Sequence, residues 1–306
     1  MSWTFDILHG PTKRLLGGLA WDGREMLASD LGNSTLLAHD PATGETRTRR
    51  KWTNRVNGIA FGPDGALYGC QEGSRRVIRM IPDGPARITT TQFHGAPHNH
   101  PCLLTVDRKG AVWFSDCHHP LPASGPQVFP LLPHQSVLRL AQGARPQSHW
   151  HIERVTFDTL RPRGVALSPD EKTLYVADTD NTPGGRRELR AYPLREDGSV
   201  EEPIVLHTFG ADRRGVHRGI EGLCVDTEGR IVACAGWQRS GPGPVVMVFS
   251  PAGAVLQSHS LPVDEPVNCA FGGPGLGTLF VTTALGHLLR AEATGAQGPK
   301  THLPVA

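Results

Sequence analysis

Residues 163–178 read RGVALSPDEKTLYVAD, two apolar runs joined by a Ser-Pro-Asp turn. The runs are rich in valine, leucine and tyrosine, which favour strands, while proline and aspartate favour a reversal of the chain. The stretch therefore predicts a β-hairpin. The sequence shows no sustained helical periodicity with capping residues, so long helices are not expected.

The same hairpin pattern recurs six times, with turns near residues 22, 64, 107, 170, 226 and 273. Successive turns are 42, 43, 63, 56 and 47 residues apart, which leaves room for two more strands after each hairpin. The sequence thus predicts an all-β fold, a six-bladed β-propeller with four-stranded blades around a central channel. We expect one domain over residues 1–306, with an insertion in the third blade at about 119–138.

Two segments lie outside this repeat. Residues 4–8 belong to no blade, and pairing with the last blade would close the ring and remove an exposed edge. The third-blade insertion is rich in proline and apolar residues, so it is expected to stay outside the sheet. It would form either a lid or wall over the channel or a surface loop.

The composition excludes several classes of protein. The formal net charge is only +2, which gives no basis for a nucleic-acid partner. No apolar stretch approaches the roughly 18 residues of a membrane span, and the N-terminus has no signal-peptide pattern. The six cysteines include no C-x-x-C pair and are typical of free thiols in a reducing compartment, so we predict a cytoplasmic protein.

The inner strands of a propeller all begin at one rim of the channel, here called the mouth. The six inner runs begin at Gly17, Asn57, Cys102, Arg163, Glu221 and Asn268. The hairpins return to the same rim at Asp30, Glu72, Asp116, Cys117, Asp178, Trp237 and Thr283. The loops around the mouth also hold five histidines: His98, His100, His118, His119 and His217. Polar groups therefore gather at the mouth, where a small-molecule site is expected.

Several repeat phrases are similar to those of a known family. They are residues 163–178, NGIAFGPDG at 57–65, and VNCAFGGP at 267–274 followed by VTTA at 281–284. Over about residues 15 to 290 the chain resembles the SMP-30/gluconolactonase/luciferin-regenerating-enzyme family. The resemblance implies a six-bladed propeller and usually a lactone or organophosphate-type hydrolase with one divalent metal, often calcium, in the channel.

The resemblance also implies where the metal ligands should lie. The family has a glutamate before the first inner strand, asparagines before the third and fourth, and an aspartate before the fifth. This chain has Gly17, Cys102, Arg163 and Glu221 there, and only Glu221 is a ligand of the right kind. A guanidinium stays charged and has no lone pair to donate, so Arg163 would repel a cation.

One hypothesis is an active site without a metal. Arg163 would bind a carboxylate or a developing oxyanion, Glu221 would act as general base, and His100 or His118 would act as the acid. Such a site suits hydrolysis of an anionic lactone or ester, or alternatively an isomerase or lyase reaction. The opposing interpretation is that Arg163 and Glu221 form only a structural ion pair that plugs the channel.

A second hypothesis keeps a divalent metal, zinc or calcium, in the mouth. Glu221, His100 and Cys102, with His98, His118 and His119 nearby, offer the carboxylate, imidazole and thiolate ligands that zinc prefers. A third hypothesis makes Cys102 a nucleophile beside a histidine.

The remaining mouth residues are assigned to the binding of a small-molecule substrate: Asn57, Cys102, Asp178, Trp237, Asn268 and His217. The leading expectation is a hydrolase of a lactone or ester. A non-catalytic propeller that only binds its partner is the alternative, because a fold by itself does not specify a function. The sequence specifies no oligomeric state.

Overall fold

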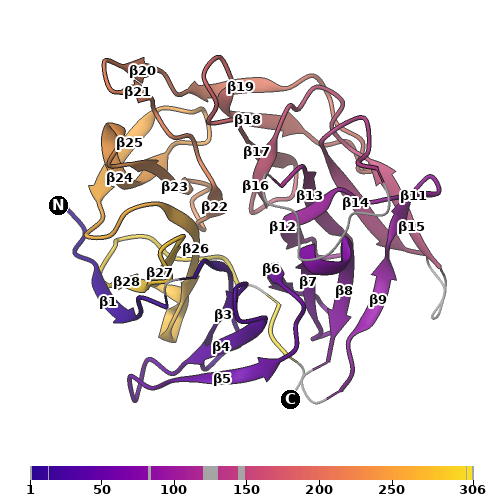
Figure 1. Cartoon of the computed structure of the whole chain (residues 1–306), viewed down its shortest axis with the longest axis horizontal. Helices are drawn as coiled ribbons and strands as arrows, with labels where there is room; N and C mark the ends of the chain where they lie inside the picture. The colour runs from indigo at the N-terminus through magenta and orange to yellow at the C-terminus, as the bar shows by residue number, and fades with distance from the viewer. Residues whose placement is uncertain are drawn as a thin grey trace.

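The computed structural model describes residues 2–12, 14–81, 84–119, 130–143, 149–300 and 302–304. In these residues six four-stranded antiparallel sheets surround a central channel (Figure 1). The predicted six-bladed β-propeller is therefore confirmed. Helical structure in the described residues is limited to two 3-10 turns, η1 (Glu72–Ser74) and η2 (Pro274–Leu276). None of the described helices is long or apolar enough to cross a membrane.

The first three blades are consecutive in the sequence, and each begins with its innermost strand. They consist of β2 (Leu16–Trp21), β3 (Met26–Asp30), β4 (Thr35–His39) and β5 (Thr46–Lys51); β6 (Val56–Phe61), β7 (Leu67–Gln71), β8 (Arg76–Met80) and β9 (Arg87–Thr90); and β12 (His100–Val106), β13 (Val112–Cys117), β14 (Ser136–Gln142) and β15 (Trp150–Arg154). A short ladder of β10 (Gln92–Phe93) and β11 (Ala96–Pro97) joins the second blade to the third.

Blades 4 and 5 follow the same order, and blade 6 takes its outer strand from the other end of the chain. They consist of β16 (Pro162–Leu167), β17 (Thr173–Thr179), β18 (Arg187–Pro193) and β19 (Ile204–Thr208); β22 (Gly222–Val225), β23 (Ile231–Trp237), β24 (Ser240–Phe249) and β25 (Val255–Ser260); and β26 (Pro266–Gly272), β27 (Thr278–Thr283), β28 (Leu288–Ala291) and β1 (Asp6–His9). A second short ladder of β20 (Ala211–Asp212) and β21 (Gly215–Val216) joins blades 4 and 5.

The ring is closed by the N-terminal strand. β1 pairs antiparallel with β28, with Asp6 opposite Arg290, and the two ends of the sequence thus share one blade (Figure 1). This confirms the pairing that we expected for the segment before the first repeat. β1 thus covers the edge of β28 and completes the four strands of blade 6.

The apolar core lies between neighbouring blades. Alternate side chains of each strand face the two adjacent sheets, so the central strands are buried on both sides. In the core between blades 2 and 3, Tyr68 and Cys70 pack with Phe114, Leu138 and Leu140. Full burial of one such large apolar side chain stabilises the fold by about 1.5–3 kcal/mol.

Glycines allow the inner strands to approach one another at the mouth. A Cβ on Gly58 would lie 2.6 Å from the Cα of Leu103, and one on Gly222 would lie 2.9 Å from the Cα of Asn268. Neither contact is possible with a larger residue unless the blades move apart. The close approach brings the side chains at the starts of adjacent inner strands within hydrogen-bonding reach of one another.

The expected insertion is the connection between β13 and β14. Residues 120–129 of it, and with them the predicted lid, lie outside the described residues. The end of this connection is held by Asn99, whose Oδ1 accepts the Leu132 N–H at 2.7 Å and whose Nδ2 donates to the His134 carbonyl at 2.8 Å.

Candidate functional site

An ion pair stands at the centre of the mouth. Arg163 lies in β16, and its Nε donates to Oε2 of Glu221, directly before β22, at 2.8 Å. The other carboxylate oxygen accepts from Nδ2 of Asn181 at 3.3 Å and lies 3.6 Å from Nη2 of Arg218. The Arg163 and Glu221 side chains remain 15% and 11% exposed. Two of the four residues predicted to be catalytic therefore meet, and a small part of each side chain remains exposed.

Both members of this pair are charged at neutral pH. Burial alone would raise the pKa of Glu221, but the positive charges of Arg163 and Arg218 outweigh burial and lower it. Burial opposes the charge on Arg163, and the surrounding cysteines and Glu221 more than compensate, so its pKa is raised. The mouth thus presents a fixed guanidinium beside a fixed carboxylate.

Two thiols lie on the other side of Arg163. Cys102 in β12 and Cys117 in β13 hydrogen-bond to each other, and Nη1 of Arg163 donates to Sγ of Cys117 at 3.4 Å. The Cys102 hydrogen bond and then the charge of Arg163 lower the pKa of the Cys117 thiol, whereas that of Cys102 is raised. The Cys102 thiol therefore keeps its proton, and Cys117 has thiolate character. Both side chains are buried.

The contacts continue into blade 2 through Asn57. Its Nδ2 donates to Oε1 of Glu72 at 2.8 Å and to Sγ of Cys102 at 3.5 Å. Its Oδ1 is buried and has no hydrogen-bond partner among the described residues. A continuous arc of polar contacts, the mouth arc, thus runs from Glu72 through Asn57, Cys102, Cys117 and Arg163 to Glu221. Four of the predicted site residues belong to it.

The two histidines proposed as acids lie beside the mouth arc. His100 is 2% exposed, and its Nδ1 accepts the His119 N–H at 3.2 Å. Burial, helped by the neighbouring His119, lowers the pKa of His100 to about 4, so the ring is neutral at neutral pH. His118 turns toward the third-blade insertion, where its Nε2 donates to the Leu132 carbonyl at 3.3 Å. Their catalytic role stays a prediction.

His98 lies deeper between blades 2 and 3. It is fully buried, with Nε2 3.2 Å from Oγ1 of Thr90 and Nδ1 3.8 Å from Oδ2 of Asp116. Burial lowers the pKa of His98 to about 3. This histidine is a neutral core residue rather than a member of the mouth arc.

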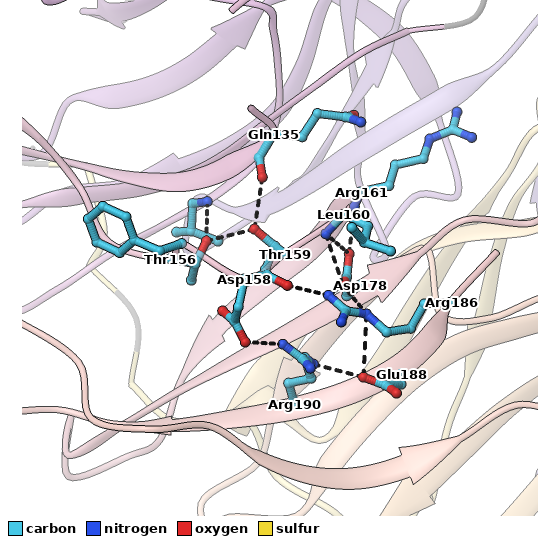
Figure 2. A network of polar contacts seen from close by, with 12 residues as sticks. Gln135, Thr156, Asp158, Thr159, Leu160, Arg161, Asp178, Arg186, Glu188 and Arg190 are labelled. Atoms are coloured by element: carbon cyan, nitrogen blue, oxygen red, sulfur yellow. Dashed lines mark hydrogen bonds and ion pairs between the residues drawn. The ribbon is translucent and has the colours of Figure 1, made fainter. Parts of the chain in front are cut away.

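Asp178 belongs to a polar network at the rim of blade 4 (Figure 2). Its Oδ1 accepts the N–H groups of Leu160 and Arg161 at 3.1 and 2.6 Å, and its Oδ2 accepts Nε of Arg186 at 2.9 Å. Arg186 continues to Glu188 at 3.6 Å. The carboxylate is fully buried and holds the loop that leads into β16, so these contacts describe a positioning residue.

The other predicted binding residues lie on blades 5 and 6. The guanidinium carbon of Arg239 lies 5.2 Å from the centre of the Trp237 ring, which it covers on one face. His217 places its Nε2 3.7 Å from Oδ2 of Asp212 in the β20–β21 ladder. Oδ1 of Asn268 accepts the N–H of the next residue at 2.9 Å, and Asn268 lines the channel. In the described part of the chain these three side chains form no hydrogen bond or ion pair with Arg163 or Glu221, and their binding role stays a prediction.

Sequence reasoning assigned no role to Arg218, Asn181 or Cys117. Arg218 is 6% exposed and donates from Nη1 to the carbonyls of Gly236 and Pro266 at 3.2 and 2.7 Å. Arg218 could have been recognised from the sequence, because it is a basic residue three positions before the candidate base Glu221. Cys117 was visible as the residue that ends a hairpin at the mouth, but its contact with an arginine of the next blade has no local sequence signal.

The residues at the family's metal positions do not fit a divalent cation. Gly17 offers no ligand, and a Cβ there would lie 2.3 Å from Oδ1 of Asn57. Cys102 is a protonated thiol, and Arg163 is itself a cation bound to Glu221. Among the described residues, no three His, Cys, Asp or Glu side chains are grouped so that they could hold a metal ion. The predicted zinc ligands are therefore not brought together in this part of the chain.

The opposite end of the channel, here called the lower chamber, is different in character. It encloses a cavity of about 250 Å³. The inner strands supply mostly apolar walls, including Trp21, Phe61, Val225 and Phe271. The C-terminal segment crosses this end: Lys300 and His302 line the cavity, and Nε2 of His302 donates to the Asp107 carbonyl at 3.2 Å.

Comparisons with known proteins agree on one family. The family model described as "SMP-30/Gluconolactonase/LRE-like region" matches residues 17–285. A gluconolactonase of Zymomonas mobilis is 28% identical over 232 residues, 74% of this chain and 60% of its own length. A 6-deoxy-6-sulfogluconolactonase of Pseudomonas putida is 29% identical over 190 residues, 62% of this chain and 56% of its own length. The matched regions thus span less than two thirds of these relatives.

A solved structure extends the similarity to most of the chain. The structure of a gluconolactonase from Xanthomonas campestris matches with a TM-score of 0.78 at 28% identity, and covers 95% of this chain and 89% of that one. A luciferin-regenerating enzyme matches with a TM-score of 0.76 at 18% identity, a likeness that concerns the fold alone.

Proposed function

Because this chain belongs to the SMP-30/gluconolactonase/LRE-like family, we propose that it hydrolyses a small anionic lactone or ester at the Arg163–Glu221 pair. The observation that carries the proposal is the 2.8 Å contact between these partly exposed, oppositely charged groups at the channel mouth. The similarity to gluconolactonases from two bacteria supports the reaction class.

Arg163 is proposed to stabilise negative charge on the substrate. Its Nε and one Nη1 hydrogen point to Glu221 and Cys117, and among the described residues its Nη2 has no hydrogen-bond partner. These remaining N–H groups can donate to a carbonyl oxygen, and they donate more strongly as that oxygen becomes an oxyanion. Preorganised donors of this kind typically contribute about 100- to 1000-fold to the rate.

Glu221 is proposed to move the proton. Its ionised carboxylate takes a proton from water as the water oxygen attacks the carbonyl carbon, which forms the tetrahedral oxyanion beside Arg163. The ring C–O bond then breaks, and the protonated Glu221 returns the proton to the leaving alkoxide oxygen. One lactone and one water thus give one hydroxy acid, and the enzyme returns to its initial state.

The local charge favours an anionic substrate. Arg163, Arg218 and Arg161 all lower the pKa of Glu221 through their positive charge, so three cations surround this one carboxylate. Arg161 remains 24% exposed, and its nearest acidic atom is Oδ1 of Asp180 at 3.8 Å. In this proposal a substrate carboxylate, phosphate or sulfonate binds to the exposed parts of these arginines.

In this proposal the guanidinium of Arg163 takes the place of the family's divalent metal. A guanidinium supplies positive charge and directed donors but cannot activate a bound water as a metal does, so the base must be Glu221.

The six free cysteines support our placement of this activity in a reducing, cytoplasmic compartment.

The test is a hydrolysis assay on a panel of neutral and acidic sugar lactones and simple esters. Wild type is compared with Arg163→Lys and Glu221→Gln. Arg79→Ala is the matched control, because it breaks an arginine–carboxylate contact of 2.7 Å with Asp64 in a turn remote from the mouth. We expect turnover of an acidic lactone by wild type and the control, with losses of about 100-fold or more in the two mouth variants. Equal turnover by all four proteins would refute the assigned site, and binding without turnover in wild type would favour a binding module.

A further inference from the structure

Three of the six cysteines meet where blades 5 and 6 face each other, a group here called the thiol cluster. Cys224 lies in β22, Cys234 in β23 and Cys269 in β26. The Sγ atoms of Cys224 and Cys269 are 3.6 Å apart, and Cys234 hydrogen-bonds to Cys269 from the adjacent strand of blade 5. None of the three is in a disulfide.

Two members of the thiol cluster are reached from the lower chamber. Cys224 and Cys269 both line the cavity of about 250 Å³, whereas Cys234 does not. Cys224 is partly exposed. A molecule the size of hydrogen peroxide or water would fit this cavity several times over, since one water occupies about 30 Å³ of liquid.

The backbones of the two strands that carry these cysteines approach each other closely. β22 and β26 belong to different blades, and no ladder hydrogen bonds join them. At Gly222, just before Cys224 along β22, the strands approach so closely that a Cβ would lie 2.9 Å from the Cα of Asn268, the neighbour of Cys269. Disulfide formation requires the distance between the two sulfurs to shorten from 3.6 Å to roughly 2.05 Å.

Cys269 is the more nucleophilic of the two thiols. Hydrogen bonds from the Cys224 and Cys234 thiols lower the pKa of Cys269 against the effect of burial. The pKa of Cys224 is raised, because its proton is engaged in that hydrogen bond. In its protonated form Cys269 donates instead to the Val232 carbonyl at 3.3 Å. The thiolate is the reactive form of cysteine.

We propose that Cys224 and Cys269 are an oxidative modification site, at which hydrogen peroxide in the lower chamber converts the two thiols to a disulfide between blades 5 and 6. The Cys269 sulfur attacks one peroxide oxygen, the O–O bond breaks, and the leaving hydroxide takes the thiol proton as water. The Cys224 sulfur then attacks the Cys269 sulfenic acid, whose S–O bond breaks, and the hydroxide leaves with the Cys224 proton as a second water. Two thiols and one peroxide give one disulfide and two waters.

The mouth pair Cys102 and Cys117 is a weaker candidate for the same chemistry. Burial does not separate the two pairs, because Cys269 is buried like Cys102 and Cys117. The difference is that neither mouth thiol lines the lower chamber and that Cys117 is engaged by Arg163. The proposal therefore makes a regional prediction: oxidation selects the lower end of the channel and spares the mouth. It is independent of the hydrolase activity, because its readout is covalent.

The experiment treats the reduced, full-length protein with about one equivalent of hydrogen peroxide. Remaining thiols are then alkylated, and peptides are mapped by mass spectrometry without reduction. We expect a Cys224–Cys269 cross-linked peptide that disappears after treatment with dithiothreitol. Because Cys234 also contacts Cys269, the Cys224→Ser/Cys234→Ser double variant leaves no neighbouring thiol to resolve the Cys269 sulfenic acid, which dimedone should trap. Cys269→Ser should consume peroxide at least ten-fold more slowly. Cys70→Ser, which removes a buried core thiol, should cross-link like wild type.

The wild-type peptide map keeps the test valid even if a variant fails to fold. No cross-link, or one that joins Cys102 to Cys117, would overturn the proposal. Equal peroxide consumption by Cys269→Ser and wild type would overturn the assignment of Cys269 as the nucleophile. The same oxidation in denaturant should give mixed disulfides, and an identical map there would show that the fold does not select the pair, which also overturns it.

Discussion

The two ends of one channel differ in what the same architecture places there. At the mouth, the starts of the inner strands carry charged and polar side chains, and the space between them is filled by the mouth arc from Glu72 to Glu221. At the lower end, the same strands finish in apolar residues around an open cavity of about 250 Å³. The cavity and the side chains proposed for catalysis therefore lie at opposite ends of the channel.

Under the proposed function, the cavity of the channel does not mark the active site. In the lower chamber the ionisable lining residues come from connecting loops and the C-terminal segment: Arg108, paired with Glu171, and Lys300 and His302. At the mouth, by contrast, an ionised carboxylate lies beside a guanidinium where the inner strands begin. Propeller symmetry explains this arrangement, because the six inner strands begin at one rim and their first side chains gather there. The substitution of one residue at that rim can therefore change the chemistry without changing the fold.

The largest expected effect concerns the mouth. Arg163→Ala should lower kcat/KM for an acidic lactone by about 100- to 1000-fold, because it removes the donors to the oxyanion. Added guanidinium ion should restore part of the rate by filling the vacated space, which a purely structural role for Arg163 would not allow. A circular dichroism melt checks that the variant is folded. An activity within three-fold of wild type would break the contrast between the two ends.

The second effect is on stability in acid, and it arises from the buried histidines near the mouth. The pKa values of His98 and His100 are lowered to about 3 and about 4, so the unfolded chain takes up protons more readily than the folded protein. Their stabilising contribution is complete above pH 6.5 and decreases as the pH falls toward the folded pKa. When the pH falls from 7 to 5, each of the two histidines should lower the free energy of unfolding by about 2 kcal/mol.

Urea denaturation at the two pH values measures this loss. The stability lost between pH 7 and 5 should be smaller by about 2 kcal/mol in His98→Gln than in wild type. It should be unchanged in His151→Gln, whose side chain is exposed. If both variants lose as much stability as wild type, the buried neutral state assigned to His98 is wrong.

A smaller effect is expected at the C-terminal segment that crosses the lower chamber. His302→Ala removes the hydrogen bond to the Asp107 carbonyl and should lower the free energy of unfolding by about 1 kcal/mol, with lactone hydrolysis unchanged. Thermal melts and the lactone assay measure the two quantities together. A large loss of activity would mean that the lower end takes part in the reaction.

The smallest effect tests the lower chamber directly. Ala270 lines this cavity, and Ala270→Leu places additional side-chain volume at its wall. Because the proposed chemistry is at the other end, kcat/KM should stay within two-fold of wild type. A competitive inhibitor or substrate that no longer binds this variant would relocate the site to the lower chamber.

The fold was predictable from the sequence because its signals are local. Each blade begins with two apolar runs around a turn, as in residues 163–178, and the repetition of that pattern identifies the propeller. The N-terminal strand β1 was predictable for a related reason: it is the one early segment without a blade, and β28 needs a partner.

The candidate site was predictable only in part, because its contacts cross between blades. Arg163 and Glu221 follow from the starts of their strands, and the structure joins them. Asp178 also ends a strand at the mouth, yet the backbone N–H groups of Leu160 and Arg161 capture its carboxylate. The partnership of Cys117 with Arg163 depends on the approach of two blades, which no local pattern encodes.

The central claim is that the guanidinium of Arg163, rather than a bound metal ion, supplies the positive charge of the active site. It is tested most directly by measuring kcat/KM for an acidic lactone before and after exhaustive treatment of the wild-type protein with EDTA, with bound metal quantified in both samples. The account predicts the same kcat/KM in the treated and untreated protein, and no gain on addition of calcium or zinc. Loss of activity in EDTA that is reversed by stoichiometric calcium or zinc would contradict it.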